Sequence, residues 1–225
     1  MPMRIAAPLL SLLGHELRAP AGVIGGYLAL IERERARLSP TQQQALDGAR
    51  RGQQAIVETL DDLRRLTLAW KAEDEPVVAT GADHLSNSAR QAAELRRLAV
   101  TIHCETAVAV ARRGRDSALA EALATVAETV ARETGCAVTI TTTVDDEGVV
   151  WRVRPAEAPA GTPAPEKFDR WRAGLGVRLV TAVTLIEASG GALIDLRVDG
   201  ARAGVDVRLP LAPAAPDGLA VSGSR

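Results

Sequence analysis

The sequence predicts a fold in two parts: an α-helical hairpin over residues 1–75 and an α/β two-layer sandwich over residues 76–212, followed by a disordered tail at residues 213–225. In the first part, apolar residues recur at steps of three and four, which is the period of a helix seam. In the second part, short runs rich in Val, Ile and Thr alternate with helical stretches rich in Ala, which is typical of an α/β sandwich. Aromatic residues make up only 2% of the chain, so Leu, Val, Ile and Ala must form most of the core.

The first helix is expected to carry one apolar stripe that a proline interrupts. Pro20 falls at the position that the stripe skips, and we expect a kink there because proline lacks a backbone N–H. The spacing is that of one face of a coiled coil. The stripe consists of Leu10, Leu13, Leu17, Ile24, Tyr27 and Ile31.

A second helix is expected to follow a break at Ser39 and to end at residues 73–76. Either Ser39 caps this helix with Pro40 in its first turn, or Thr41 is the cap. Two helices joined by a short loop form an antiparallel hairpin, which cannot bury its seam alone, so we expect a homodimer with a four-helix bundle. The second stripe consists of Ala45, Ala49, Gly52, Ile56, Leu60 (or Thr59), Leu63, Thr67 and Trp70.

The α/β part is expected to alternate helices and strands up to about residue 210. A hairpin is predicted around the turn at residues 145–148, and a proline-rich loop over residues 155–165. The predicted helices span residues 82–98, 117–133 and 175–189, and the predicted strands span residues 100–104, 107–111, 137–144, 148–153, 192–198 and 204–209.

Composition narrows the class of protein. The chain has 27 basic and 28 acidic residues and a net charge of −1, so nothing in it favours binding to nucleic acid or to a membrane surface. No run reaches the roughly 18 to 20 apolar residues of a membrane span, and Pro8 interrupts the short apolar N-terminal run, which we do not interpret as a signal peptide. We expect a cytoplasmic protein with Cys104 and Cys136 as reduced thiols, a disulfide being the alternative.

One histidine on the first helix is a candidate for chemistry. His15 lies two positions from both Leu13 and Leu17, about 200° of helical turn from each, so its imidazole should point away from the stripe. An exposed imidazole beside a carboxylate, here Glu16, suits reversible phosphorylation, because one ring nitrogen can attack phosphorus while the carboxylate holds or deprotonates the ring. Taken alone, His15 would more simply be an inert surface histidine.

The surroundings of His15 resemble the H-box of sensor histidine kinases. Residues 13–20 read LGHELRAP and residues 24–27 read IGGY. Residues 167–171 (KFDRW) look like the F-box of that family, and residues 174–180 (GLGVRLV) with 187–193 (EASGGAL) look like its second glycine box and the helix after it. The resemblance covers roughly residues 8–210. It implies that His15 accepts a phosphoryl group with Glu16 as supporting acid or base, and that the partners are a second copy of the chain and a response regulator receiver domain.

The nucleotide site that the family would place in the second part is degenerate in this sequence. Where asparagines that hold Mg²⁺ are expected, the chain has Thr125 and Thr129, while Arg132 keeps a basic residue where a lysine is common. Pro155 stands where an aspartate would accept the adenine amino group, and proline cannot do so.

The glycine boxes and the lid depart from the family as well. Glu157 and Pro159 replace glycines of the first box, and Arg172 replaces the leading glycine of the second, although Gly174 and Gly176 could still present backbone donors to an anion. The loop that would form the lid over ATP is short. We therefore expect no resident cofactor and no phosphorylation from ATP.

The sequence is compatible with three functions. The first is a histidine phosphotransferase or pseudo-kinase that relays phosphate between His15 and a regulator. The second is an active cytosolic kinase with an atypical Mg-ATP site, which would need a sensor kinase or other sensor partner. The third is a non-catalytic docking module, for which His15 would be dispensable. Ala19 stands where phosphatase-competent members often carry a hydroxyl or amide, so we do not expect phosphatase activity.

The remaining candidates receive simpler interpretations. His84 is expected on a helix surface, and His103 and Cys104 are adjacent strand residues that face opposite ways, so no metal site is predicted. The three tryptophans, Trp70, Trp151 and Trp171, are expected to be packing anchors.

Overall fold

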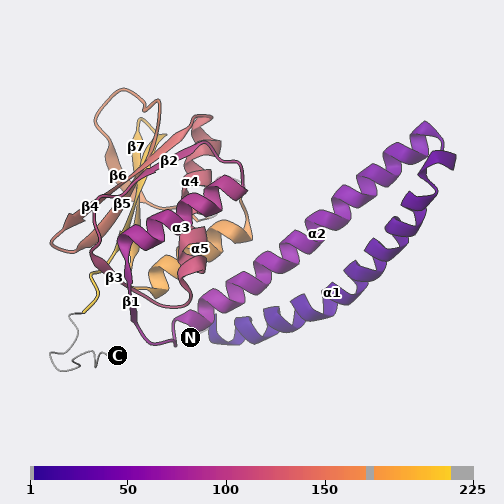
Figure 1. Cartoon of the computed structure of the whole chain (residues 1–225), viewed down its shortest axis with the longest axis horizontal. Coiled ribbons are helices and arrows are strands. Elements are labelled where there is room, and N and C mark those ends of the chain that lie inside the picture. The colour runs from indigo at the N-terminus through magenta and orange to yellow at the C-terminus, as the bar shows by residue number, and fades with distance from the viewer. Residues whose placement is uncertain (1–2, 171–174, 214–225) are drawn as a thin grey trace, which may run out of the picture.

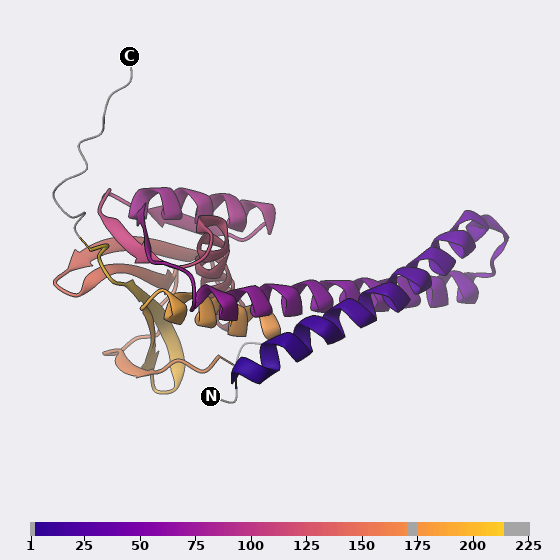
Figure 2. The same ribbon diagram turned by 90° about the horizontal axis from the view of Figure 1, so that it is seen from below.

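The structure, a computed structural model, describes residues 3–170 and 175–213, with side chains from residue 10 onward. It consists of a long helical hairpin with an α/β domain packed against one end of it (Figures 1 and 2). Both predicted parts are present in the predicted order.

The hairpin is formed by α1 (Met3–Arg33) and α2 (Pro40–Ala72), joined by a short 3₁₀ helix at Arg35–Arg37. The first of the two predicted caps is confirmed. Ser39 accepts a hydrogen bond from the Gln42 backbone, the Gln42 side chain accepts one from the Ser39 backbone, and Pro40 occupies the first turn. α1 continues through Pro20 without a break and is visibly bowed (Figure 1).

Contact between the two helices rests on a few small or medium side chains. Ala21, Leu46 and Leu60 are buried there. The Gln53 amide donates to the Ala21 carbonyl at 3.3 Å, and a Cβ at residue 25 would lie 2.9 Å from the same Gln53 nitrogen and displace it. The predicted apolar stripe of α1 is not buried by this contact. Its residues Leu13, Leu17, Ile24, Tyr27 and Ile31 are exposed in the single chain.

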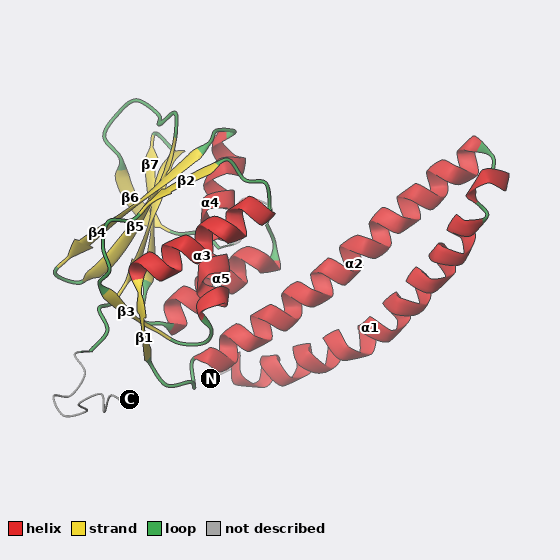
Figure 3. Cartoon of the chain, in the orientation of Figure 1, coloured by secondary structure: helices red, strands yellow, loops and turns green. Residues whose placement is uncertain are grey.

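The α/β domain places three helices on one face of a six-stranded sheet (Figure 3). The strand order is β2-β4-β5-β8-β7-β6, parallel only between β2 and β4. Two further strands, β1 and β3, pair antiparallel in a small separate sheet. The helices are α3 (Ala82–Leu95), α4 (Asp116–Thr134) and α5 (Val177–Ala188). The strands are β1 (Val78–Gly81), β2 (Val100–His103), β3 (Ala109–Arg112), β4 (Val138–Asp145), β5 (Gly148–Pro155), β6 (Ala164–Lys167), β7 (Ala192–Val198) and β8 (Ala201–Leu209).

The core lies between these helices and the sheet. Leu123 of α4, Ile186 of α5 and Val207 of β8 are fully buried in it. Trp151 of β5 is 1% exposed, and its indole N–H donates to the Ser86 hydroxyl of α3 at 2.9 Å, which satisfies the one polar atom of a buried ring. The core is therefore complete although the nucleotide motifs are degenerate.

The sequence prediction was wrong at several places in this domain, among them the start of β8, which lies at residue 201 rather than 204. Helix α3 ends at Leu95 rather than residue 98, because Arg97 takes a left-handed conformation with φ of 56°. The segment assigned to the proline-rich loop contains the start of β6, whose Pro165 is tolerated because β6 is an edge strand. Strand β1 was not predicted, since it is short and mostly exposed.

The predictions for the two cysteines and the tail have different outcomes. Cys104 and Cys136 are both free thiols, as predicted. Residues 214–225 of the predicted disordered tail lie outside the described residues. Among the helices of residues 3–170 and 175–213, none combines the length and the apolarity that crossing a bilayer requires.

Candidate functional site

His15 lies on the open surface of α1. Its side chain is 85% exposed, and the nearest acidic group is Glu16, with 3.9 Å between His15 Nδ1 and a Glu16 carboxylate oxygen. That distance is beyond a hydrogen bond. The predicted exposure of the imidazole is thus observed, and a partner molecule could approach Nε2 freely.

Two features lie close to His15 on α1: an ion pair that holds α1 against α2, and a proline that removes one backbone hydrogen bond of the helix. One turn away, Arg18 donates to Asp61 of α2 at 2.7 Å. Pro20 has no N–H to offer the Glu16 carbonyl, so that carbonyl loses its helical donor. The histidine therefore sits on a helix that is anchored across the hairpin yet lacks one internal hydrogen bond close by.

The predicted nucleotide residues on α4 are engaged within the protein. Thr129 is fully buried, and its hydroxyl donates to the Thr125 carbonyl at 2.9 Å, so it faces the helix itself. The Thr125 hydroxyl donates to the Glu121 carbonyl and accepts from Arg96 at 2.8 Å. Neither hydroxyl is presented as a magnesium ligand. In residues 3–170 and 175–213, no group of His, Cys, Asp and Glu side chains has the arrangement of a metal site.

A buried carboxylate that the sequence analysis did not single out organises the charged residues of α4 and α5. Glu128 is 5% exposed and pairs with Arg178 of α5 at 2.6 Å and with Arg132 of α4 at 3.0 Å. Arg96, just after α3, approaches the same carboxylate at 3.5 Å. Arg132 is therefore an ion-pair partner of Glu128. The one sequence signal for this cluster was an acidic residue in the middle of an Ala- and Val-rich helix.

The turn before α5 keeps part of a glycine box. Gly176 precedes α5 with φ of 54°, a conformation that favours glycine. Gly174 and Arg172, and also Trp171, lie outside the described residues. Only Gly176 of the two predicted glycines is thus placed, at the N-terminus of α5, where the next turn carries Arg178.

At the position where the resemblance implies an adenine acceptor, Pro155 closes β5 and pairs with Val138 of β4. The next backbone N–H, that of Ala156, donates to the Ala137 carbonyl, so it is used within the fold. Glu157, the acidic residue considered as a substitute acceptor, is exposed.

Close to this loop, a buried ionic cluster occupies the space between β7, β8 and the end of α4. Asp195 accepts from Arg197 at 2.9 Å and from Arg202 at 2.9 and 3.0 Å. Arg202 also meets Glu133 of α4 at 3.2 Å, and its guanidinium lies 5.2 Å from the centre of the Phe168 ring. Asp195 thus accepts hydrogen bonds from two buried guanidinium groups, one of which also meets Glu133.

An exposed histidine on a helical hairpin, joined to an α/β domain with three helices on one sheet face and a glycine turn before the last helix, defines the fold of sensor histidine kinases. Solved structures agree. The histidine kinase AdeS of Acinetobacter baumannii has a TM-score of 0.53 at 16% identity, over 88% of this chain and 98% of that chain. Full-length ShkA in complex with AMPPNP has a TM-score of 0.62 at 22% identity, over 93% of this chain.

The chain spans about half the length of ShkA, 47% of it. No family model matches the sequence, and no curated protein matches it either. The resemblance inferred from the motifs is therefore confirmed at the level of the fold, and the roles of individual residues stand on the geometry described above.

Proposed function

We propose that this chain is a cytoplasmic two-component signalling protein that accepts a phosphoryl group on His15 and exchanges it with the aspartate of a response regulator receiver domain. The observation that carries the proposal is His15 itself, 85% exposed on α1 inside an H-box-like segment. An upstream sensor kinase would supply the phosphoryl group through such a regulator.

The transfer uses only groups that the hairpin provides. Glu16 lies on the Nδ1 side of the His15 ring, at 3.9 Å, and can hold a proton at Nδ1, which leaves Nε2 unprotonated and nucleophilic. Nε2 attacks the phosphorus of an aspartyl phosphate, the N–P bond forms, and the bond from phosphorus to the aspartate oxygen breaks. The aspartate leaves as a carboxylate, and the reverse reaction follows the same path.

The α/β domain supports transfer without Mg-ATP. The Thr129 hydroxyl is bonded to its own helix, Arg132 pairs with Glu128, and Pro155 replaces the adenine acceptor. Each lost contact to a nucleotide leaves a polar group unpaired, at a cost of about 1–3 kcal/mol. The domain then serves as a folded partner of α2.

A homodimer follows from the apolar face of α1. Leu13, Leu17, Ile24, Tyr27 and Ile31 are each roughly half exposed in the single chain, in a continuous stripe. Exposed apolar stripes of this length mark a protein interface, and a second copy of the hairpin would bury them in a four-helix bundle. His15 would stay outside that interface.

The experiment exposes the protein separately to labelled Mg-ATP and to a receiver domain that carries labelled aspartyl phosphate. We expect acid-labile label on the protein only from the receiver, and none on the His15→Gln variant. Label from ATP on His15 would show that the protein is an autokinase rather than a relay. The absence of label from both donors would indicate a non-catalytic docking module.

The autokinase is the second candidate, and one observation favours it. Gly176 keeps the left-handed turn before α5, where backbone donors can meet a phosphate. Calorimetric titration with Mg-ATP separates the two functions, since micromolar binding would contradict the relay without ATP.

A further inference from the structure

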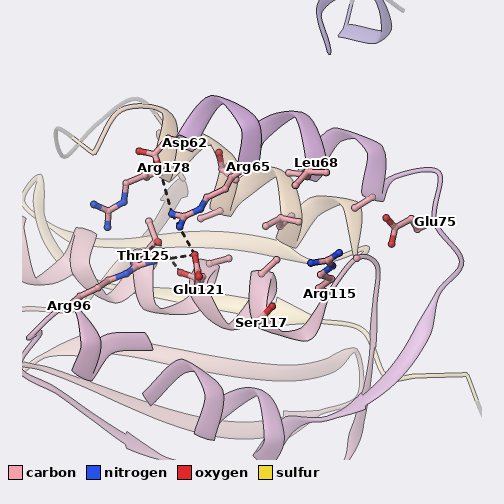
Figure 4. A pocket seen from close by; sticks show the side chains of 18 residues that line it. Asp62, Arg65, Leu68, Glu75, Arg96, Arg115, Ser117, Glu121, Thr125 and Arg178 are labelled. Carbon is pink, nitrogen blue, oxygen red and sulfur yellow. Dashed lines mark hydrogen bonds and ion pairs between the residues drawn. The ribbon is translucent and has the colours of Figure 1, made fainter. Parts of the chain in front are cut away.

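A cavity of about 340 Å³ lies where α2 meets α4 and α5, and neither His15 nor Pro155 is among the residues that line it. Figure 4 shows it from close by, with side chains of α2 on one wall and side chains of α4 and α5 on the others. Its size is within the range of about 300–1,000 Å³ that small-molecule sites occupy, and such sites favour domain interfaces. The proposed phosphotransfer makes no use of this cavity.

The middle of the cavity is apolar. Leu68 of α2 borders it and is 54% exposed, although it lies beside the domain interface. The opposite walls are built from small side chains, which leave the space open. These are Ala69, Ala72, Ala118, Ala122 and Ala182, with Leu185.

One end of the cavity carries three guanidinium groups. Arg65 comes from α2, Arg96 from the end of α3 and Arg178 from the first turn of α5, and Figure 4 shows them gathered with Asp62 and Glu121. The other end is bordered by Arg115 and Glu75. The cavity is thus apolar in the middle and rich in guanidinium groups at one end, which we call its basic end.

At this basic end Arg178 is neutralised by Glu128 at 2.6 Å, and Arg96 donates to the Thr125 hydroxyl at 2.8 Å and lies 3.5 Å from Glu128, whereas Arg65 is only loosely neutralised. Arg65 meets Glu121 at 3.7 Å and Asp62 at 3.6 Å, and Arg96 meets Glu121 at 3.7 Å, all longer than hydrogen bonds. Burial and, after it, the positive charge of Arg178 lower the pKa of the Arg96 guanidinium, while Glu121 and Glu128 raise it. An anion placed beside Arg96 would offset the repulsion from Arg178.

We propose that this cavity binds a small amphipathic monoanion, with its carboxylate between Arg65 and Arg96 and its apolar body along Leu68. Charge selects the class of ligand. Asp62 and Glu121 share the basic end, so that it accepts one negative charge more readily than the two or more of a phosphate ester. A ligand placed there touches both parts of the molecule and would hold the α/β domain on α2.

The test is calorimetric titration of the full chain with octanoate, 1-octanol and octylamine as probes. We expect octanoate to bind, 1-octanol to bind at least about tenfold more weakly because it lacks the charge-assisted contact, and octylamine not to bind. Equal binding of octylamine and octanoate, or no binding of octanoate, would overturn the proposal.

Two pairs of variants locate the site. Leu68→Trp fills the cavity and Arg65→Gln removes a guanidinium, and each should weaken octanoate binding by about tenfold or more. Leu95→Trp and Arg64→Gln are matched controls at exposed positions that do not line the cavity, and both should bind octanoate as the wild type does. Circular dichroism checks folding, and Arg65→Gln keeps the test valid if the tryptophan disturbs α2. Wild-type binding in both cavity variants would contradict the proposal.

Discussion

The hairpin and the α/β domain differ in how closely their residues resemble the motifs of histidine kinases. Along α1 the H-box-like segment is nearly intact, while the apolar stripe around it stays exposed in the single chain. In the α/β domain the core is fully packed, from Leu123 to Trp151 and Ile186, while the residues expected at a nucleotide are replaced or tied up in ion pairs. Packing and ligand chemistry are separable in such a fold, because different side chains carry the two.

The largest effect is expected at the centre of the intact motif. His15→Gln should abolish phosphoryl transfer, because it removes the receiving nitrogen, and should change the free energy of unfolding by less than about 0.5 kcal/mol, because the side chain is exposed. Label transfer from a phosphorylated receiver and urea unfolding measure the two quantities. His84→Gln, at another exposed histidine, is the control and should transfer normally.

The buried ionic cluster around Asp195 tests how strongly the stability of the α/β domain depends on buried ion pairs. Asp195→Asn leaves Arg197 and Arg202 buried without their shared carboxylate, so the domain should lose about 3–5 kcal/mol of stability. Urea unfolding followed by tryptophan fluorescence measures this loss. Asp199→Asn, in an exposed turn with φ of 49°, should be nearly neutral. Equal effects of the two variants would contradict the assignment.

The exposed stripe tests the proposed dimer. Ile24→Asp should cost about 3 kcal/mol per dimer, from about 1.5 kcal/mol for each of two equivalent side chains, and so weaken association roughly a hundredfold. Light scattering over a dilution series detects the change. Val144→Asp, at an equally exposed valine of β4, should leave the mass unchanged, and a wild-type chain that is monomeric at every concentration would contradict the dimer.

The smallest effect is expected at the surface of the hairpin. A double-mutant cycle of Arg18→Ala and Asp61→Ala should give a coupling energy of about 0.2–1 kcal/mol, because both side chains are about half exposed. Urea unfolding at low salt measures it, and added salt should reduce it. A coupling energy as large as the effect of Asp195→Asn would remove the contrast between the two parts.

Much of the fold could be predicted from local sequence. The capping residues Ser39 and Pro40, the order of elements and the exposure of His15 all follow from patterns within a few residues of each other. The place of Pro155 at the end of β5 also lies within two residues of the predicted end of that strand. These features depend on residue chemistry at a single position.

The parts that could not be predicted depend on contacts between distant segments. Leu66, Ala69 and Ala72 are buried because α5 packs on α2, not because of any pattern in α2 itself. Strand β6 is defined only by its pairing with β7.

His15 and its neighbours were set by the sequence alone, because a helical period decides which way a side chain points. The carboxylate of Glu128 at the meeting point of three arginines, the Asp195 cluster and the cavity beside Leu68 were decided only by the tertiary structure. Each of them joins side chains that are far apart in the chain, and only the packing of whole elements brings such groups within a few ångströms.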